Sequence, residues 1–309
     1  MNLFKDFEIR RVATSNAQIN LRVGGNGPPL LLIHGYPQTH YCWHAVAPRL
    51  AENFSVITPD LRGYGGSSKP PDNAAHTVYS KRTMAQDLSE VMTLLGHQIF
   101  QVVGHDRGAR VGYRLALDSP ERVKRFCSLD VVPTCNMWET IDKTRALGAF
   151  HWSFLAQPAP IPERMISAEA DSFHTHLMQS WAKLGFQFDQ DALAIYLEAM
   201  RNPQTIAASC GDYRAGASVD DAQDLDDRLN GRKIACPILF LWGGARGFGG
   251  PLKMDTNKGL RGREPLDIWR GWCDGDVTGG PIDCGHFLPE EAPEEVLSHL
   301  YHFLSAEHP

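Results

Sequence analysis

The turn at residues 104–108, with the sequence GHDRG, constrains the fold of this chain more than any other feature. It follows an apolar run at 100–103 that has the character of a buried strand, and it precedes a helical pattern that continues to about residue 117. Glycines on both sides of the central residues are needed where a strand turns sharply into a helix, because the backbones there pass closely. The pattern therefore predicts that Asp106 lies at the tip of a strand–turn–helix unit, in the position of a nucleophile.

Short apolar runs alternate with helical patterns through most of the chain. The runs at 30–33, 54–58, 100–103, 126–129 and 238–241 have the length of strands that are buried on both faces. Alternating strands and helices predict the α/β class with a mostly parallel, doubly wound sheet. The strand runs stop between 136 and 230, where helical patterns rich in Trp, Phe, Met and His replace them. We therefore predict an α/β core from residues 1–135 and 231–309, interrupted by a helical cap at 136–230, with a separate helical domain as the alternative.

Composition narrows the class of function. The formal net charge of −6 disfavours nucleic acid as a partner, because phosphates are bound by basic surfaces. No apolar run approaches the roughly 20 residues of a membrane-spanning helix, and the N-terminus becomes polar too early for a signal peptide. Seven scattered cysteines without a CxxC pair indicate reduced thiols rather than a disulfide framework or a zinc site. We expect a cytoplasmic enzyme that acts on a small molecule, with no metal, no organic cofactor, no nucleic acid and no membrane partner.

The residue type at position 106 determines the predicted chemistry. A carboxylate displaces a leaving group from saturated carbon and forms an ester, which water must then hydrolyse. An HGYP turn at 34–37 directly follows the first long apolar strand. The backbone N–H groups of Tyr36 in this turn and of Arg107 beside the nucleophile are predicted to form an oxyanion hole.

Two further residues complete a candidate catalytic triad. His286 lies in a Gly-His-Phe turn shortly before the last predicted helix, and a histidine with a pKa near neutrality can activate water against the ester. Asp130 ends the strand at 126–129, and a buried carboxylate there needs a partner such as an imidazolium. The alternative for Asp130 is a structural aspartate that caps a turn.

These motifs resemble those of the fluoroacetate (haloacetate) dehalogenases, a branch of the α/β-hydrolase superfamily with an aspartate nucleophile. The resemblance covers nearly the whole chain and is most specific in the sequence HDRGAR at 105–110. It implies the α/β-hydrolase fold and implies that Arg107 and Arg110 bind the substrate carboxylate, beside a helix N-terminus that itself favours anions. In the cap it implies that a halide site is formed by donors from three residues, His151, Trp152 and Tyr213. It also implies that Trp181 limits the size of the substrate, and that the protein forms a homodimer through the cap.

The predicted activity is hydrolysis of short 2-haloacids to 2-hydroxy acids, and whether fluoride itself is expelled stays open. Epoxide hydrolysis is the alternative, with Tyr196 and Tyr213 as candidate acids for the opening oxygen. A hydrolase-fold receptor without turnover is a third possibility, which the three candidate triad residues argue against. The segment from Gly243 to Arg263 is longer and richer in Gly, Lys and Arg than the family pattern, and its role is open.

Overall fold

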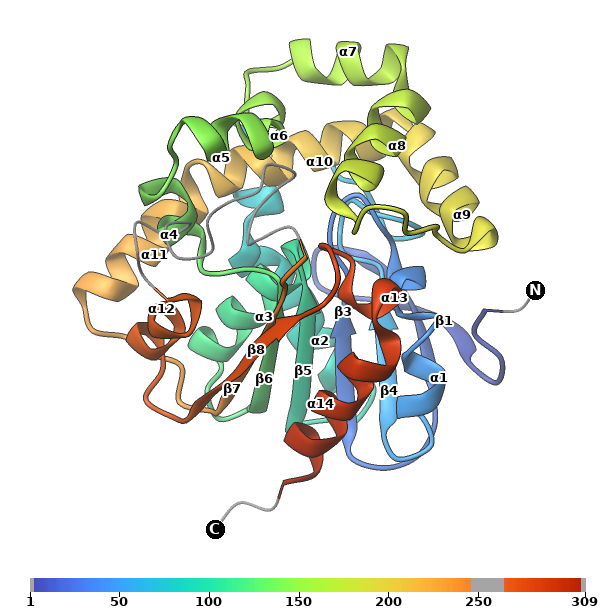
Figure 1. Ribbon diagram of the computed structural model, residues 1–309, viewed down its shortest axis with the longest axis vertical. Helices are drawn as coiled ribbons and strands as arrows, with labels where there is room; N and C mark the ends of the chain where they lie inside the picture. The colour runs from blue at the N-terminus through green and yellow to red at the C-terminus, as the bar shows by residue number, and fades with distance from the viewer. Residues whose placement is uncertain (1–2, 246–263, 307–309) are drawn as a thin grey trace.

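An eight-stranded sheet forms the centre of the computed structural model, which describes residues 3–245 and 264–306 (Figure 1). The strand order is β1-β2-β4-β3-β5-β6-β7-β8. The strands from β3 to β8 run parallel, whereas β2 runs antiparallel to both β4 and β1. This topology confirms the predicted mostly parallel α/β sheet. The strands are β1 (Glu8–Ala13), β2 (Gln18–Gly24), β3 (Pro29–Ile33), β4 (Ser55–Pro59), β5 (Phe100–His105), β6 (Val123–Leu129), β7 (Ile238–Gly243) and β8 (Val277–Ile282).

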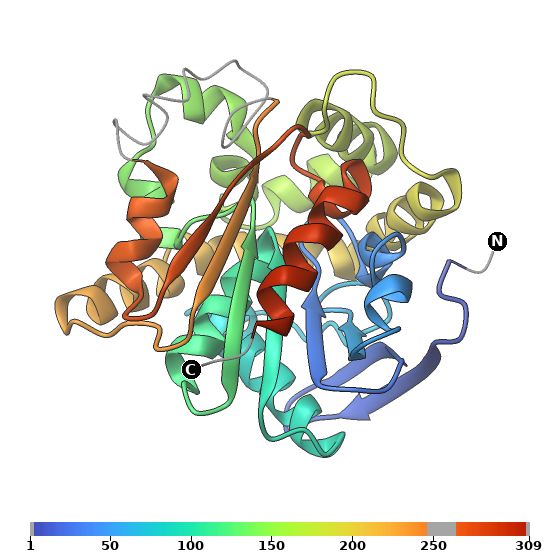
Figure 2. The same ribbon diagram turned by 60° about the horizontal axis from the view of Figure 1, so that its bottom comes forward.

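Helices cover both faces of this sheet. Figures 1 and 2 show α14 on one face, with α2 and α3 on the opposite face. Every residue of β5 is buried, as expected for a central strand between two helical layers. The core helices are η1 (His40–Trp43), α1 (Ala47–Leu50), η2 (Thr77–Tyr79), α2 (Lys81–Leu94), α3 (Arg107–Asp118), α12 (Pro265–Trp272), α13 (Leu288–Glu291) and α14 (Pro293–Ser305).

Eight consecutive helices, α4 to α11, connect β6 to β7 in a stretch that is described throughout. In Figure 1 the helices α5 to α10 arch over the end of the sheet at which the parallel strands finish. We call this helical layer the cap. Its helices are α4 (Thr134–Glu139), α5 (Lys143–Gly148), α6 (Phe150–Leu155), α7 (Ile161–Ala168), α8 (Ala170–Trp181), α9 (Gln190–Arg201), α10 (Pro203–Gly216) and α11 (Val219–Leu229).

The placement of the cap determines where a ligand can bind. In open α/β sheets, ligands bind outside the carboxyl ends of the strands, because the loops there converge. The cap covers this end of the sheet. Among the described residues, every helix is too short or too polar to cross a lipid bilayer.

Candidate active site

Asp106 lies in the turn between β5 and α3, with φ 49° and ψ −120°. Positive φ is unusual for a residue with a side chain, and here the packing around the turn enforces it. A Cβ added to Gly108 would lie 2.2 Å from the carbonyl oxygen of Ile33, and one added to Gly104 would lie 2.5 Å from the Cα of Ala109. Both flanking glycines are therefore required by close backbone contacts, which is the reason that the sequence pattern predicted this turn.

The carboxylate of Asp106 is held by backbone N–H groups on one side and faces a histidine on the other. The backbone N–H of Tyr36 donates to Oδ1 at 2.9 Å, and the backbone N–H of Arg107 also hydrogen-bonds the carboxylate. The Nε2 atom of His286 lies 3.7 Å from Oδ2. Burial raises the pKa of Asp106, but the charges of His286, His105 and Arg107 outweigh it and lower the pKa below its usual value. Asp106 is therefore ionised, with Oδ1 fixed and Oδ2 turned toward His286.

His286 is bonded to Asp130 on its other side. Its Nδ1 lies 2.5 Å from Oδ2 of Asp130, while Oδ1 of Asp130 accepts the backbone N–H of Gly243 at 2.9 Å. Burial lowers the pKa of His286, but the hydrogen bond and charge of Asp130 and the charge of Asp106 outweigh it, so the pKa is raised. The structure thus places the imidazole of His286 between two carboxylates, hydrogen-bonded to Asp130 and 3.7 Å from Asp106.

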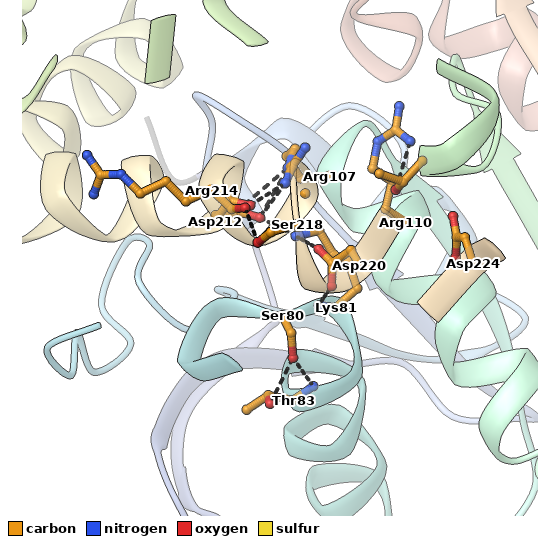
Figure 3. Close-up of polar contacts among 12 residues, drawn as sticks. Ser80, Lys81, Thr83, Arg107, Arg110, Asp212, Arg214, Ser218, Asp220 and Asp224 are labelled. Atoms are coloured by element: carbon orange, nitrogen blue, oxygen red, sulfur yellow. Dashed lines mark hydrogen bonds and ion pairs between the residues drawn. The ribbon is translucent and has the colours of Figure 1, made fainter. Parts of the chain in front are cut away.

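Arg107 is completely buried and paired with a carboxylate from the cap. Its Nη2 donates to Oδ1 of Asp212 at 2.6 Å and to the backbone oxygen of Asp212 at 2.7 Å (Figure 3). The same carboxylate accepts from Lys81 and, at 2.7 Å, from the hydroxyl of Tyr64. The Nη1 atom of Arg107 is buried without a partner. This guanidinium is therefore fixed by Asp212 and keeps one N–H group free.

Arg110 is equally buried but has neutral hydrogen-bond partners. Its Nη1 donates to the backbone oxygen of Val132 at 2.8 Å and to Oγ1 of Thr134 at 3.2 Å, and its Nε has no partner. Burial and the charge of Arg107 lower the pKa of Arg110. In Figure 3 both guanidinium groups lie on the side of the network away from Ser80. Two buried guanidinium groups with free N–H donors, on the helix that begins directly after Asp106, have the chemistry to bind an anion.

The cap contributes a cluster of aromatic donors above these arginines. The ring centroids of His151 and Tyr213 are 5.5 Å apart, and those of Trp152 and Tyr213 are 5.9 Å apart. The guanidinium carbon of Arg107 lies 4.3 Å from the ring centroid of Tyr213, and that of Arg110 lies 4.6 Å from the ring centroid of Trp152. Burial lowers the pKa of His151 to about 3, so its imidazole is neutral. Its Nδ1 and the hydroxyl of Tyr213 are buried without partners.

Trp181 packs beside this aromatic cluster. Its ring centroid is 4.4 Å from that of His151, 5.5 Å from that of His286 and 6.3 Å from that of Tyr36. The indole therefore lies between the imidazoles of His151 and His286 and packs against both. The structure brings together every residue that the sequence analysis assigned to the carboxylate, halide and triad positions.

Tyr196, the second candidate for epoxide opening, lies elsewhere. Its hydroxyl donates to Oε1 of the buried Glu290 at 3.0 Å, and the other oxygen of Glu290 accepts from Gln38. The two predicted tyrosines are therefore not paired over Asp106. In the long segment after β7, residues 246–263 lie outside the described residues.

Sequence reasoning missed several residues that support the site. The buried carboxylate of Asp212 directly precedes Tyr213, and the adjacency of an acid to a predicted site residue was the available signal. Two others carried no such signal, because charged residues at a helix start or helix end are usually solvated: Lys81, which donates to Asp212, and Glu291, which accepts the backbone N–H groups of Gly285 and Phe287 beside His286. Their contacts depend on tertiary packing.

Comparisons with known proteins agree with this geometry. The family model described as alpha/beta hydrolase fold matches residues 28–293. A fluoroacetate dehalogenase from Burkholderia sp is 40% identical over 304 residues, covering 98% of this chain and 95% of that protein. A soluble epoxide hydrolase from Corynebacterium sp. (strain C12) is 31% identical, and the match covers 91% of both proteins. A crystal structure described as an α/β hydrolase, from Nostoc sp PCC 7120, has a TM-score of 0.90 at 46% identity and covers 98% of this chain and 99% of that one.

The family match extends over most of the chain, and the protein therefore belongs to the α/β hydrolases, as its strand order and the turn at Asp106 indicate. Its particular branch is the haloacetate dehalogenase family, which confirms the resemblance seen in the sequence.

Proposed function

We propose that this protein is a hydrolytic dehalogenase of short 2-haloacids, which converts a haloacetate and water to a 2-hydroxy acid and halide. The observation that carries the proposal is the pair of buried arginines on α3, next to the ionised carboxylate of Asp106. A carboxylate nucleophile requires an electrophilic saturated carbon, and the arginines require a negative charge on the same small molecule. The dehalogenase name of the Burkholderia relative supports the same substrate class.

In the first step, Oδ2 of Asp106 attacks the carbon that bears the halogen. The carbon–oxygen bond forms as the carbon–halogen bond breaks, and the halide leaves with the electron pair. Arg107 and Arg110 hold the substrate carboxylate, which orients the carbon for attack. The neutral His151, together with Trp152 and Tyr213, donates hydrogen bonds to the departing halide. The product of this step is an ester on Asp106 whose carbonyl oxygen is Oδ1.

In the second step, His286 takes a proton from water, and the hydroxide adds to the ester carbonyl carbon. Negative charge develops on Oδ1, where the backbone N–H groups of Tyr36 and Arg107 stabilise it. Collapse of this intermediate breaks the bond between the carbonyl carbon and Oδ2, which is now part of the product. This oxygen takes the proton from His286 and becomes the hydroxyl group of the 2-hydroxy acid. Asp106 then loses its own proton to solvent, so one turnover releases one proton and one halide. Asp130 stabilises the imidazolium that exists between the two proton transfers.

The direct test is halide release from chloroacetate and fluoroacetate, measured beside hydrolysis of a panel of epoxides. We expect halide release from chloroacetate and little turnover of neutral epoxides, because the buried arginines favour an anionic substrate. Absence of halide release from every haloacid would overturn the proposal. Diol formation from a neutral epoxide would instead favour the alternative, with Tyr213 as the acid. Halide release from fluoroacetate is the more demanding test, because fluoride is a poorer leaving group than chloride.

We also propose that the protein forms a homodimer through the cap and acts in the cytoplasm. Leu147, Phe150, Ile161 and Met165 on α5, α6 and α7 are exposed apolar residues that a second copy could cover. All seven cysteines are buried free thiols, which fits a reducing compartment. Light scattering after size-exclusion chromatography tests the dimer, and the variant Met165→Glu is expected to shift it toward monomer.

A further inference from the structure

The carboxylate of Glu291, the last residue of α13, accepts hydrogen bonds from three backbone N–H groups. Oε1 accepts the N–H of Phe287 at 2.8 Å, and Oε2 accepts those of Gly285 at 2.8 Å and Lys183 at 2.7 Å. Gly285 and Phe287 flank His286 in the sequence, whereas Lys183 follows α8 in the cap. One half-buried side chain therefore joins the turn that carries the imidazole to a segment of the cap.

Further contacts bind the same two segments together. The backbone N–H of His286 donates to the carbonyl oxygen of Trp181 at 2.9 Å. A Cβ added to Gly285 would lie 2.4 Å from the backbone nitrogen of Lys183, so the two backbones are in direct contact. On the core side, Nε2 of His105 bonds the carbonyl oxygen of His286 at 2.7 Å. The backbone around the imidazole is thus held by the cap and the core together.

We propose that Glu291 is a positioning residue for His286, which holds the turn at 285–287 against the cap segment 181–183 and so aligns the imidazole with the ester on Asp106. The inference rests on the proposed function. Without these three hydrogen bonds the turn loses its anchor to Lys183, although the contacts to Trp181, His105 and Asp130 remain, and Nε2 of His286 is held less firmly at its place 3.7 Å from Oδ2 of Asp106. A general base must lie within hydrogen-bond reach of the water that it deprotonates, so a displaced imidazole slows that proton transfer.

Glu291 should act on only one of the two chemical steps. Attack by Asp106 uses the arginines and the halide donors, and Glu291 is not hydrogen-bonded to either group in the contacts above. Hydrolysis of the ester, in contrast, depends on the position of His286. Loss of the Glu291 contacts should therefore slow hydrolysis selectively, and the ester should accumulate on Asp106.

The variant Glu291→Gln tests this prediction. Its amide NH₂ group faces an N–H donor in place of a carboxylate oxygen, so at least one of the three hydrogen bonds is lost. With chloroacetate we expect the first-turnover rate of halide release to stay within about twofold of wild type, whereas kcat falls roughly tenfold or more, a part of the roughly 10²–10⁴-fold that a positioned base supplies. Intact-mass spectrometry during turnover should show a larger fraction of protein carrying one added carboxymethyl group. Glu295→Gln, at an exposed glutamate on α14, is the matched control. It should have the first-turnover rate, the kcat and the fraction of esterified protein of wild type.

A second pair of variants keeps the test valid if Glu291→Gln folds poorly. Lys183→Pro removes the N–H that the cap donates to Glu291, and the preceding Ala182 already has the extended conformation that proline requires, with φ −71° and ψ 157°. Lys183→Ala keeps the N–H and serves as its reference. We expect Lys183→Pro to accumulate more ester than Lys183→Ala.

Two outcomes would overturn the role of Glu291. One is an equal loss of the first-turnover rate and of kcat in Glu291→Gln without added ester, which would indicate a general structural role. The other is an equal fraction of esterified protein during turnover in Lys183→Pro and Lys183→Ala. A wild-type protein that releases no halide from any haloacid would overturn the proposed function instead, so the two failures are distinguishable.

Discussion

Arg107 of the core and Asp212 of the cap form a fully buried ion pair, with 2.6 Å between Nη2 and Oδ1. Lys81 and Asp220 extend this pair into a network of two cations and two carboxylates (Figure 3). The charges of this network cancel, whereas Arg110 has neutral partners. We therefore expect Arg110 to supply the net positive charge for a bound carboxylate, and Arg107 to supply a fixed hydrogen-bond donor.

Asp212→Asn should destabilise the protein strongly. Removing one partner of a buried ion pair leaves an uncompensated charge, which costs about 3–5 kcal/mol. The free energy of unfolding from urea titration measures the effect. Asp171→Asn is the control, because its pair with Arg201 is about half exposed and water screens it. Equal losses in the two variants would contradict the structural importance of the buried pair.

His286→Asn should stop the reaction after the first step. The variant keeps Asp106 and the arginines, so chloroacetate should still alkylate Asp106, but the ester should be hydrolysed roughly 10²–10⁴-fold more slowly without the base. We expect one halide per protein molecule and a stable mass increase. Asp106→Ala should show neither, and residual turnover in that variant would remove Asp106 from its role.

Asp130→Asn should move the pH dependence of kcat. His286 must be neutral to accept a proton, and its pKa is raised, mainly because Asp130 offsets the effect of burial, so activity should rise with pH through a value above that of free histidine. Without the charge of Asp130, burial dominates and the rising limb should move to lower pH. The plateau should fall roughly 10²-fold or more, since the imidazolium is no longer stabilised. A pH–rate profile in which only the plateau changes would contradict this account.

Trp181→Ala should enlarge the range of substrates. The indole lies between the imidazoles of His151 and His286, and removing it opens space for a longer 2-haloacid. The ratio of kcat/KM for 2-chlorobutanoate to that for chloroacetate should rise roughly tenfold or more, the scale of a few methylene groups in a pocket. Leu184→Ala, at a side chain that is 90% exposed, should leave the ratio unchanged.

Glu290→Gln should flatten the pH dependence of stability. Burial raises the pKa of Glu290 to about 8, although Gln38 and Tyr196 oppose the shift. The folded protein therefore keeps this proton up to about pH 8, while the unfolded chain loses it above its ordinary value of 4.5. Stability due to this group is present below pH 4.5 and is lost as the pH rises toward 8, by about 1.4 kcal/mol per pKa unit.

The difference in unfolding free energy between wild type and Glu290→Gln, taken at pH 5.5 and at pH 8.5, isolates this effect because other groups cancel. We expect wild type to lose stability relative to the variant at the higher pH. A difference that does not change with pH would show that Glu290 is ionised throughout.

The central part of the fold could be predicted because buried strands have a strong sequence signal. β3 and β7 are nearly continuous apolar runs and β5 and β6 contain shorter ones, and each strand was expected within a few residues of its observed bounds. The edge strands were missed. β1 is almost entirely exposed, with the polar sequence EIRRVA, and β8 contains two adjacent glycines in the sequence VTGGPI. At a sheet edge, hydrogen bonds from a neighbouring strand define the structure more than the side chains do.

In the candidate site, too, some residues could be predicted from local sequence and others could not. Asp106 and His286 lie in short turns with their own sequence patterns, so local sequence was informative. The predicted acid, Asp130, is held by Gly243, a contact between residues 113 positions apart that no local pattern reveals. Glu291 and Asp212 act through backbone and ion-pair contacts across the cap boundary, and such contacts become visible only when the two layers are placed together.

The insertion of the cap between β6 and β7 separates two kinds of recognition along the gene. The candidate nucleophile and the two arginines are encoded before the insertion, in the turn after β5 and on α3, whereas the candidate halide donors are encoded within it, on α6 and α10. Mutations at the donor positions of the insertion can therefore change which leaving group is accepted without replacing the residues proposed to make the attack. A lineage with this arrangement can explore new carbon–heteroatom bonds by varying one contiguous stretch of coding sequence.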